Sequence, residues 1–457
     1  MNKQAVIAVL AATSLLFAEA YQVNTLSTKQ LGMGHTGAGQ SSIGVEGMHF
    51  NPGGLGIMNY KIDAAAGATF ITPRVEVNGT TAEKGVSTPL SIYAGTNLRK
   101  WSFGMSVTTP YGNSAEWDKN WEGAELIQDI SLKVIAFQPT IGFSILNIVG
   151  IGAGVTINTG SFSQSKALVG PGALNGYSVL AAGLSNAGMT PQATDVNSIV
   201  NKYKDTSAVS ATLSGDADTK IGFNAGVMVN VIPKFLSAGV AYRHGVKAKV
   251  SGGKTEINYA DAKTKAEIEQ LNQIISVANP NTPKVVIPPL DKGTFEAELP
   301  LPANLNIGVS LTPTEKLLFN FDVQWIGWGA YDSLILQYSN EVGNLKLPSA
   351  KMYENSMAFR FGTQIGIKEN LDVRLGAYFD QTPVPNEYLN PETPSTNKVG
   401  ITTGCSFRPI PMLSIDAAVL YVRCTHERET DANNKNNFAA KYKVQAIAPS
   451  VGVSFRF

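Results

Sequence analysis

The C-terminal residues of this chain alternate between apolar side chains and small or polar ones. The two parities consist of Val451, Val453, Phe455 and Phe457 on one side and Ser450, Gly452, Ser454 and Arg456 on the other. Alternation with a period of two places successive side chains on opposite faces of a β-strand. The same pattern recurs over residues 319–325, 359–367 and 371–380. The chain is therefore predicted to consist largely of strands with one apolar face each.

Strands followed by parity and ended at turn residues number about fourteen. Their predicted ranges are 61–72, 88–98, 100–110, 125–145, 149–160, 219–231, 236–250, 291–311, 316–336, 356–368, 371–380, 398–408, 412–423 and 443–457. The connections alternate between short turns, such as Glu369-Asn370, and long loops, the longest being 161–218 and 251–290. Tight turns at one end and long loops at the other, with an even strand count, are typical of outer-membrane barrels, whereas a β-sandwich has no reason for this asymmetry. We predict an all-β fold: a transmembrane antiparallel β-barrel of about 14 strands.

In such a barrel the apolar faces point to lipid and the polar faces to the lumen, because lipid cannot satisfy an open sheet edge. Aromatic residues near the strand ends are expected to form the interfacial girdles of the barrel. The candidates are Trp101, Tyr242, Trp325, Trp328, Tyr331 and Tyr421.

The N-terminal residues 1–20 have the layout of a secretory signal peptide. Lys3 precedes a short apolar run over Ala5–Phe17, and Ala18-Glu19-Ala20 forms a small-x-small cleavage site. The run is shorter than the roughly 20 residues that a membrane-spanning helix needs. We therefore expect export to the outer membrane of a Gram-negative bacterium. The predicted domains are the signal peptide at 1–20, an N-terminal segment at 21–60 and the barrel at 61–457.

Composition and charge exclude several other functions. The formal net charge is +1 with 16% charged residues, so no basic patch indicates nucleic acid. The two cysteines, Cys405 and Cys424, are predicted near opposite ends of neighbouring strands, beyond the ~7 Å limit for a disulfide, and should be free thiols. Gly32–Gly37 fits G-x-G-x-x-G, but no strand–helix unit surrounds it, so it does not predict a dinucleotide site. No cofactor or metal is expected.

The two longest loops contain apolar residues at helical spacing. These are Val196 and Ile199 in the first loop and Ile268, Leu271 and Ile275 in the second. Apolar loop surface of this kind can bind an apolar ligand in a groove. Alternatively, the two loops pack on each other.

Several motifs resemble those of the FadL family of outer-membrane long-chain fatty-acid and hydrocarbon transporters. The resemblance covers essentially the whole chain after the signal peptide. The matching residues are Leu31-Gly32-Met33-Gly34, Asn51-Pro52-Gly53-Gly54-Leu55, Trp117 and Trp121, Leu299–Asn304, Trp325-Ile326-Gly327-Trp328 with Tyr331-Asp332, and Phe379–Pro385. Asn51-Pro52-Gly53 corresponds to the Asn-Pro-Ala motif of the family's hatch, from which Gly53 departs.

The resemblance implies that residues 21–60 form a hatch inside a fourteen-stranded barrel. It also implies a lateral exit at an inward kink of the third strand, here at Phe103 and Gly104; alternatively, Gly104 faces the lumen simply to leave space. The expected function is passive uptake of hydrophobic molecules, namely fatty acids or hydrocarbons. A movement near Asn51-Pro52 would connect a pocket above the hatch to this exit.

Lumen parity makes Arg360 and Arg374 candidates for binding a carboxylate. Alternatively, they form structural ion pairs, because three acidic residues share the lumen, namely Asp322, Asp372 and Asp416. The expected partners are hydrophobic small molecules and outer-membrane lipid. A closed barrel has no edge that demands a second subunit, so we expect a monomer.

Two other functional classes are compatible with parts of this pattern. A general polar-solute porin would keep the barrel but would need neither hatch nor apolar loops. An outer-membrane enzyme would need a nucleophile and a base at the outer rim. Of the four histidines, His35 and His49 fall in the hatch segment, and His244 and His426 have no serine-centred motif nearby. An enzyme is not expected.

Overall fold

Fourteen antiparallel strands close into a barrel in the computed structural model, which describes residues 20–83, 86–340 and 343–457. Each strand pairs with the next one around the barrel, and the first pairs with the last. In order they are β1 (Ile62–Thr69), β4 (Leu90–Leu98), β5 (Trp101–Glu116), β6 (Asp129–Ile145), β7 (Val149–Val169), β8 (Val209–Ile232), β9 (Leu236–Arg243), β12 (Asn304–Thr314), β13 (Leu317–Ile326), β16 (Ser356–Lys368), β17 (Leu371–Asp380), β18 (Lys398–Ile410), β19 (Leu413–Cys424) and β21 (Ala440–Arg456). The fold predicted from the parity is confirmed. The predicted signal peptide, apart from Ala20, lies outside the described residues.

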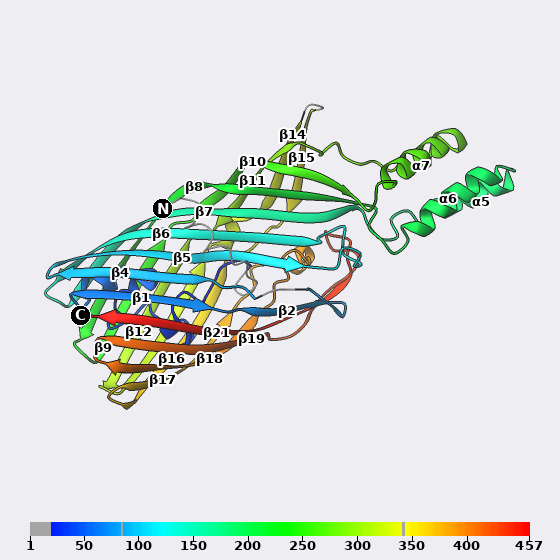
Figure 1. Ribbon diagram of the computed structural model, residues 1–457. Helices are drawn as coiled ribbons and strands as arrows, with labels where there is room; N and C mark the ends of the chain where they lie inside the picture. The colour runs from blue at the N-terminus through cyan, green and yellow to red at the C-terminus, as the bar shows by residue number, and fades with distance from the viewer. Residues whose placement is uncertain (1–19, 84–85, 341–342) are drawn as a thin grey trace.

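Short turns connect the strands at one end of the barrel and long segments connect them at the other (Figure 1). Three of the short turns contain a left-handed residue, Arg99, Asn147 or Lys234, each with φ between 56° and 67°. Such a conformation reverses the chain within two or three residues. The predicted asymmetry between the two ends is confirmed, and the short-turn end is the periplasmic end of an outer-membrane barrel.

Further strands extend the wall at the end with the long connections. They are β2 (Thr72–Val77), β3 (Thr80–Thr81), β10 (Val246–Tyr259), β11 (Thr294–Leu301), β14 (Ser333–Asn340), β15 (Gly343–Ala350) and β20 (Arg428–Thr430). The predicted single strands 236–250, 291–311 and 316–336 are therefore each divided in two. Pro302 lies between β11 and β12 and, without an N–H group, cannot donate a hydrogen bond to a neighbouring strand. After β13 the chain forms a 3₁₀ turn, η1 (Trp328–Ala330), before β14 begins.

Side-chain polarity inverts along the longest strands while the parity stays constant. On β21, the outward residues near the periplasmic end are apolar, such as Val451 and Phe455, whereas Lys441 and Lys443 point outward at the other end. The inward residues change in the opposite direction, from small or polar ones such as Gly452 and Ser454 near the periplasmic end to the apolar Tyr442 and Val444 at the other end. The periplasmic half is thus built for lipid outside and a polar interior. The other half is built for water outside and an apolar lumen.

The predicted aromatic girdle is partly wrong. Trp101, Tyr242 and Tyr421 are exposed on the outer face, but Trp328 and Tyr331 are buried. The reason is that β13 ends at Ile326 and the η1 turn that follows places Trp328 in the buried core. The prediction of two free thiols is confirmed: Cys405 lies opposite Ala417 on the neighbouring strand, and neither cysteine forms a disulfide.

Three helices project beyond the end of the barrel opposite the short turns (Figure 1). They are α5 (Tyr177–Asn186), α6 (Thr190–Lys202) and α7 (Thr264–Ala278). Lys202 on α6 lies 2.5 Å from a carboxylate oxygen of Glu267 on α7 and 2.9 Å from Asp261. The hydrogen bond from Lys202 lowers the pKa of Asp261 to about 2. No helix in the described part of the chain is both long enough and apolar enough to cross a membrane.

Candidate functional site

Residues 21–60 lie inside the barrel and carry three one-turn helices (Figure 1). These are α2 (Thr28–Leu31), α3 (Gly47–Phe50) and α4 (Gly53–Gly56), and most of their residues are buried. We refer to residues 21–60 as the hatch. Such short helices have little stability of their own, because helix nucleation is costly. The hatch is therefore held in shape by the surrounding wall.

A belt of lumen-facing glycines surrounds the hatch. On twelve of the fourteen strands, a Cβ atom added to one glycine would lie against a hatch atom. The glycine belt consists of Gly67, Gly95, Gly104, Gly142, Gly152, Gly226, Gly239, Gly308, Gly362, Gly376, Gly404 and Gly452. Several are direct cross-strand partners, such as Gly362 with Gly376. At seven of these glycines the nearest hatch atom belongs to the hatch backbone, and at the other five it belongs to a side chain such as that of Thr28 or Val45. Because glycine has no side chain, the hatch can approach the wall backbone this closely.

Asn51 of the predicted hatch motif joins the hatch to itself and to the wall. Its amide nitrogen donates to the carbonyl oxygen of Ala38 at 2.9 Å and to that of Val227 on β8 at 3.0 Å. Its amide oxygen accepts a hydrogen bond from the Gly53 backbone at 2.9 Å. Asn51 is fully buried, and Pro52 and Gly53 continue against Gly152 and Gly150 of β7. The motif thus anchors the hatch against β7 and β8.

Asn51→Ala is expected to destabilise the hatch by several kcal/mol, since each buried group left without a hydrogen bond costs about 1–3 kcal/mol. The measurement is hydrogen exchange of hatch amides in the purified barrel, where protection over residues 38–56 should fall. Asn306→Ala, on β12 and facing the upper cavity described below, is the matched control. Unchanged protection in Asn51→Ala would contradict the anchoring role.

A cavity of about 40 Å³ lies on the side of the hatch away from the short turns. Its lining includes Arg243, Arg360, Asp322, His35 and His49, with apolar members such as Phe50 and Pro110. We call it the upper cavity. Most of the side chains that line the upper cavity are polar or charged. The apolar surface lies further up the lumen.

Two arginines line the upper cavity, and only one of them forms an ion pair with a described residue. Arg360 lies 3.2 Å from Asp380 and donates to Gln324, but its Nη1 has no partner among the described residues. Arg243 donates to the carbonyl oxygen of His49 at 3.2 Å and to Gln138 at 3.1 Å. No carboxylate of the described chain lies within 4.0 Å of Arg243. Sequence reasoning missed Arg243, although its neighbour Tyr242 points outward and lumen parity would have found it.

The second predicted arginine, Arg374, lies on the other side of the hatch. It lines a cavity of about 340 Å³ near the short turns, together with Lys29, Arg408 and Arg456. We call this the lower cavity. Arg374 donates to Gln364 at 2.8 Å and to Ser406 at 2.6 Å, and lies 3.9 Å from Asp372. The structure therefore separates Arg360 from Arg374.

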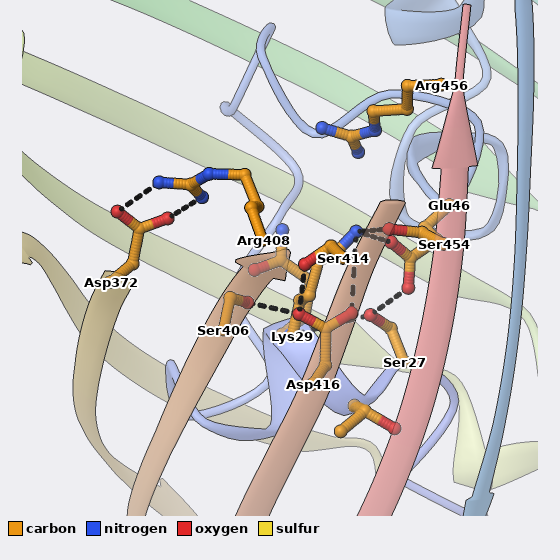
Figure 2. Close-up of polar contacts among 12 residues, drawn as sticks. Ser27, Lys29, Glu46, Asp372, Ser406, Arg408, Ser414, Asp416, Ser454 and Arg456 are labelled. Atoms are coloured by element: carbon orange, nitrogen blue, oxygen red, sulfur yellow. Dashed lines mark hydrogen bonds and ion pairs between the residues drawn. The ribbon is translucent and has the colours of Figure 1, made fainter. Parts of the chain in front are cut away.

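An ionic cluster at the lower cavity ties the hatch to the wall (Figure 2). Lys29 lies 3.3 Å from Glu46 of the hatch and 3.7 Å from Asp416 of β19. It also donates to Ser454 of β21 at 2.5 Å, and Ser27 donates to Glu46 at 2.6 Å. In the part of the chain that the structure describes, no three His, Cys, Asp or Glu side chains form a metal-binding group.

Phe103 points outward and Gly104 inward on β5. At both positions β5 pairs with β4 on one side and β6 on the other, so the wall is closed here. Pairing with β4 ends at Thr108, and the β5–β6 register shifts between Thr108 and Tyr111. An opening at Phe103 and Gly104 stays a prediction. The register shift lies four to seven residues beyond Gly104, between Thr108 and Tyr111.

The N-terminal end of the hatch covers the free edge of β5. Gln22 forms an antiparallel bridge with Tyr111, and the Val23 backbone donates to the carbonyl oxygen of Pro110 at 2.9 Å. Residues 21–23 thus occupy the place that β4 leaves vacant beside β5.

The apolar residues predicted to line a loop groove lie in a packed core between the projecting helices. Val196, Ile199, Ile268, Leu271 and Ile275 are all buried and belong to one cluster. The structure therefore shows the second alternative, in which the two loops pack on each other, and these side chains do not form an open groove.

The lumen above the upper cavity is filled by apolar and aromatic side chains. They come from the hatch and from strands around the whole barrel, and form one cluster. Its large members include Tyr21, Tyr111, Trp117, Trp121, Phe162, Phe295, Trp328, Tyr331 and Tyr353. Trp117 and Trp121 stack with ring centroids 4.3 Å apart, and Tyr21 meets Trp328 edge-on at 4.6 Å.

Comparisons with known proteins agree with this architecture. The family model described as "Outer membrane protein transport protein (OMPP1/FadL/TodX)" matches residues 9–457. The long-chain fatty acid transport protein of Escherichia coli O157:H7 is 21% identical over 441 residues, covering 91% of this chain and 90% of that protein. The crystal structure of a Pseudomonas aeruginosa FadL homologue aligns with a TM-score of 0.75 and 18% identity, covering 96% of this chain and all of that one. The Pseudomonas putida toluene transporter TodX aligns with a TM-score of 0.66 and 14% identity, with coverage of 96% and 100%.

Proposed function

The chain belongs to the OMPP1/FadL/TodX family of outer membrane transport proteins, and from this premise we propose that it is a passive uptake channel with a lateral exit. It is a FadL/TodX-type outer-membrane transporter of fatty acids or hydrophobic aromatic compounds. The family consists of transporters and channels rather than enzymes.

The apolar upper lumen is the observation that carries the proposal. A porin has a polar, water-filled interior, whereas here the inward residues above the hatch are Phe295, Leu334, Tyr442 and others of the same kind. Transfer of each methylene group from water to such a surface contributes about 0.8 kcal/mol. Burial alone can therefore draw a hydrophobic molecule into the barrel, and no energy source is needed for this step.

A fatty acid also carries a carboxylate, and Arg243 is the cation best suited to receive it. Arg360 and Arg374 are already paired with Asp380 and Asp372, whereas Arg243 forms no ion pair with any described residue and donates to the His49 carbonyl oxygen and to Gln138. A cavity of about 40 Å³ has room for the carboxylate head group of a fatty acid but not for its acyl chain. The acyl chain would then extend upward by displacing packed apolar side chains.

For the exit we propose the free edge of β5 beside Pro110. Pro110 and Gln22 line the upper cavity, so this edge is adjacent to the bound head group. Displacement of residues 21–23 would open the wall between β4 and β5 toward the membrane. Phe103 and Gly104 lie on the same strand, but both are paired on each side.

Uptake assays in cells lacking their own transporter test the proposal and the role of Arg243 together. We expect uptake of radiolabelled long-chain fatty acid in wild type and a loss of about tenfold or more in Arg243→Met, since a charge-assisted hydrogen bond contributes about 1.5–3 kcal/mol. Toluene uptake should not change. Arg74→Met, on the outer face of β2, is the matched control.

The possible outcomes separate the hypotheses. Equal losses of uptake for fatty acid and toluene in Arg243→Met would contradict the head-group role of Arg243. They would not contradict the proposal that the protein is an uptake channel. No uptake of either compound by wild type, together with a large ion conductance in planar bilayers, would replace the proposal with a polar-solute porin.

A further inference from the structure

The glycine belt is interrupted at two strands, β13 and β19. At β19, Asp416 takes part in the ionic cluster around Lys29. At β13, the lumen-facing residues that hydrogen-bond with the hatch are Asn320 and Asp322, two positions apart on one face of the strand. Hatch and wall therefore meet through polar side chains at β13, whereas on the twelve belt strands the hatch packs directly against a glycine of the wall.

A chain of hydrogen bonds crosses this junction. The amides of Asn320 and Gln30 both donate to the side-chain oxygen of Gln40, at 2.8 and 2.9 Å. Asn320 also donates to Thr36 at 3.1 Å. One oxygen of Asp322 accepts hydrogen bonds from the backbones of Gly37 and Ala38, at 2.6 and 2.9 Å. We call Gln30, Thr36, Gln40, Asn320 and Asp322 the β13 seam.

Three acceptors of the β13 seam lack a hydrogen-bond partner within the described chain. They are Oε1 of Gln30, Oδ1 of Asn320 and Oδ1 of Asp322, and all three side chains are at most 5% exposed. Rotating either amide by 180° would leave its nitrogen unpaired instead. A buried polar group without a partner costs about 1–3 kcal/mol, so three at one place indicate polar occupants that the protein itself does not supply.

The seam is also the partition between the two cavities. The upper cavity reaches Ala38, His35 and Asp322, and the lower cavity reaches Gln30, Met33 and Gln40. The lower cavity includes exposed residues at the short-turn end, such as Tyr60 and Glu315. Gln40 accepts from both neighbouring amides, so movement of this one side chain would break the partition.

We propose that the β13 seam is a narrow water-lined path by which small monovalent cations cross the hatch, with Gln40 as its gate. The unpaired atoms are oxygens, which solvate cations and water. Asp322 is the one charged residue among the five of the seam, and Arg360, its partner across the strand pair on β16, is itself paired with Asp380. This activity goes beyond uptake of hydrophobic compounds, whose route uses the apolar lumen and the edge of β5.

Conductance of the purified protein in planar lipid bilayers tests the path. In a potassium chloride gradient, we expect a small wild-type conductance with a reversal potential on the cation-selective side. Gln40→Ala should raise the conductance severalfold by removing the gate. Asp322→Asn should reduce the preference for cations. If Asp322→Asn does not fold, Gln40→Ala alone still decides, since Gln40 lies in a hatch turn and not in the barrel wall.

The matched control is Thr402→Ala, which removes another hatch–wall hydrogen bond, the one from the Gly34 backbone to a residue of β18. Its conductance should equal that of wild type. An equal increase in Thr402→Ala would show general loosening of the hatch and overturn the proposal. Anion selectivity, or no conductance in both wild type and Gln40→Ala, would overturn it as well. These results do not depend on uptake of fatty acid or toluene, so the two proposals fail separately.

Discussion

Gly152→Ala is expected to displace the hatch and to make cells permeable to hydrophilic compounds that the wild-type barrel excludes. A Cβ atom at this position would overlap the carbonyl oxygen of Pro52 and lie 2.8 Å from the backbone nitrogen of Gly53. Backbone atoms cannot rotate away as a flexible side chain can. The hatch must therefore shift as a unit, because Asn51 bonds it to β8 on one side and Gly56 contacts Gly142 on the other.

Overpacking of a tight interface costs about 1–3 kcal/mol, and here the strain falls on a segment with little stability of its own. We would measure entry of a large hydrophilic antibiotic into cells and the melting temperature of the purified barrel. Gly366→Ala is the matched control, since this glycine of β16 lies outside the belt and its Cβ would be 3.4 Å from Lys316. Unchanged permeability and melting temperature in Gly152→Ala would show that the contact with the hatch is not tight.

The barrel could be predicted from the sequence because lipid imposes a simple rule on outward residues. Val451, Val453 and Phe455 must be apolar, so parity alone identifies the strand and its face. Beyond the lipid, the outward positions of the same strand are occupied by Lys441 and Lys443, so outward residues are no longer apolar. The pattern does not mark the residue at which a strand leaves the membrane. For this reason, the strands above it were predicted too short, or as part of loops 161–218 and 251–290.

Parity also identifies the face of a residue but not its level in the barrel. Arg360 and Arg374 were correctly placed on the lumen side, yet the hatch separates them into different cavities. The glycine belt could not be predicted for the same reason. Gly308 and Gly362 can each be assigned to the lumen face from sequence, but only strand register shows that they lie at one level around the hatch.

A disulfide between Gln22→Cys and Tyr111→Cys is expected to abolish uptake of hydrophobic compounds, and reduction is expected to restore it. These residues are direct partners in an antiparallel bridge, where Cα atoms lie about 4.5–5.5 Å apart, within the range of a disulfide. The bond would fix residues 21–23 to the free edge of β5. The variants are made with Cys405→Ser and Cys424→Ser, so that no other thiol competes.

The same cross-link distinguishes the two positions for the exit along β5. At Gly104, a larger side chain would contact the ends of Met48 and Leu55, at 2.5 and 3.3 Å for the first added atom, and flexible side chains can move. If the exit lies beside Pro110, uptake stops in the oxidised double-cysteine protein but continues in Gly104→Val and in each single-cysteine control. If it lies at Phe103 and Gly104, Gly104→Val blocks uptake and the cross-link does not. Full uptake in both variants would contradict a lateral exit at either position along β5.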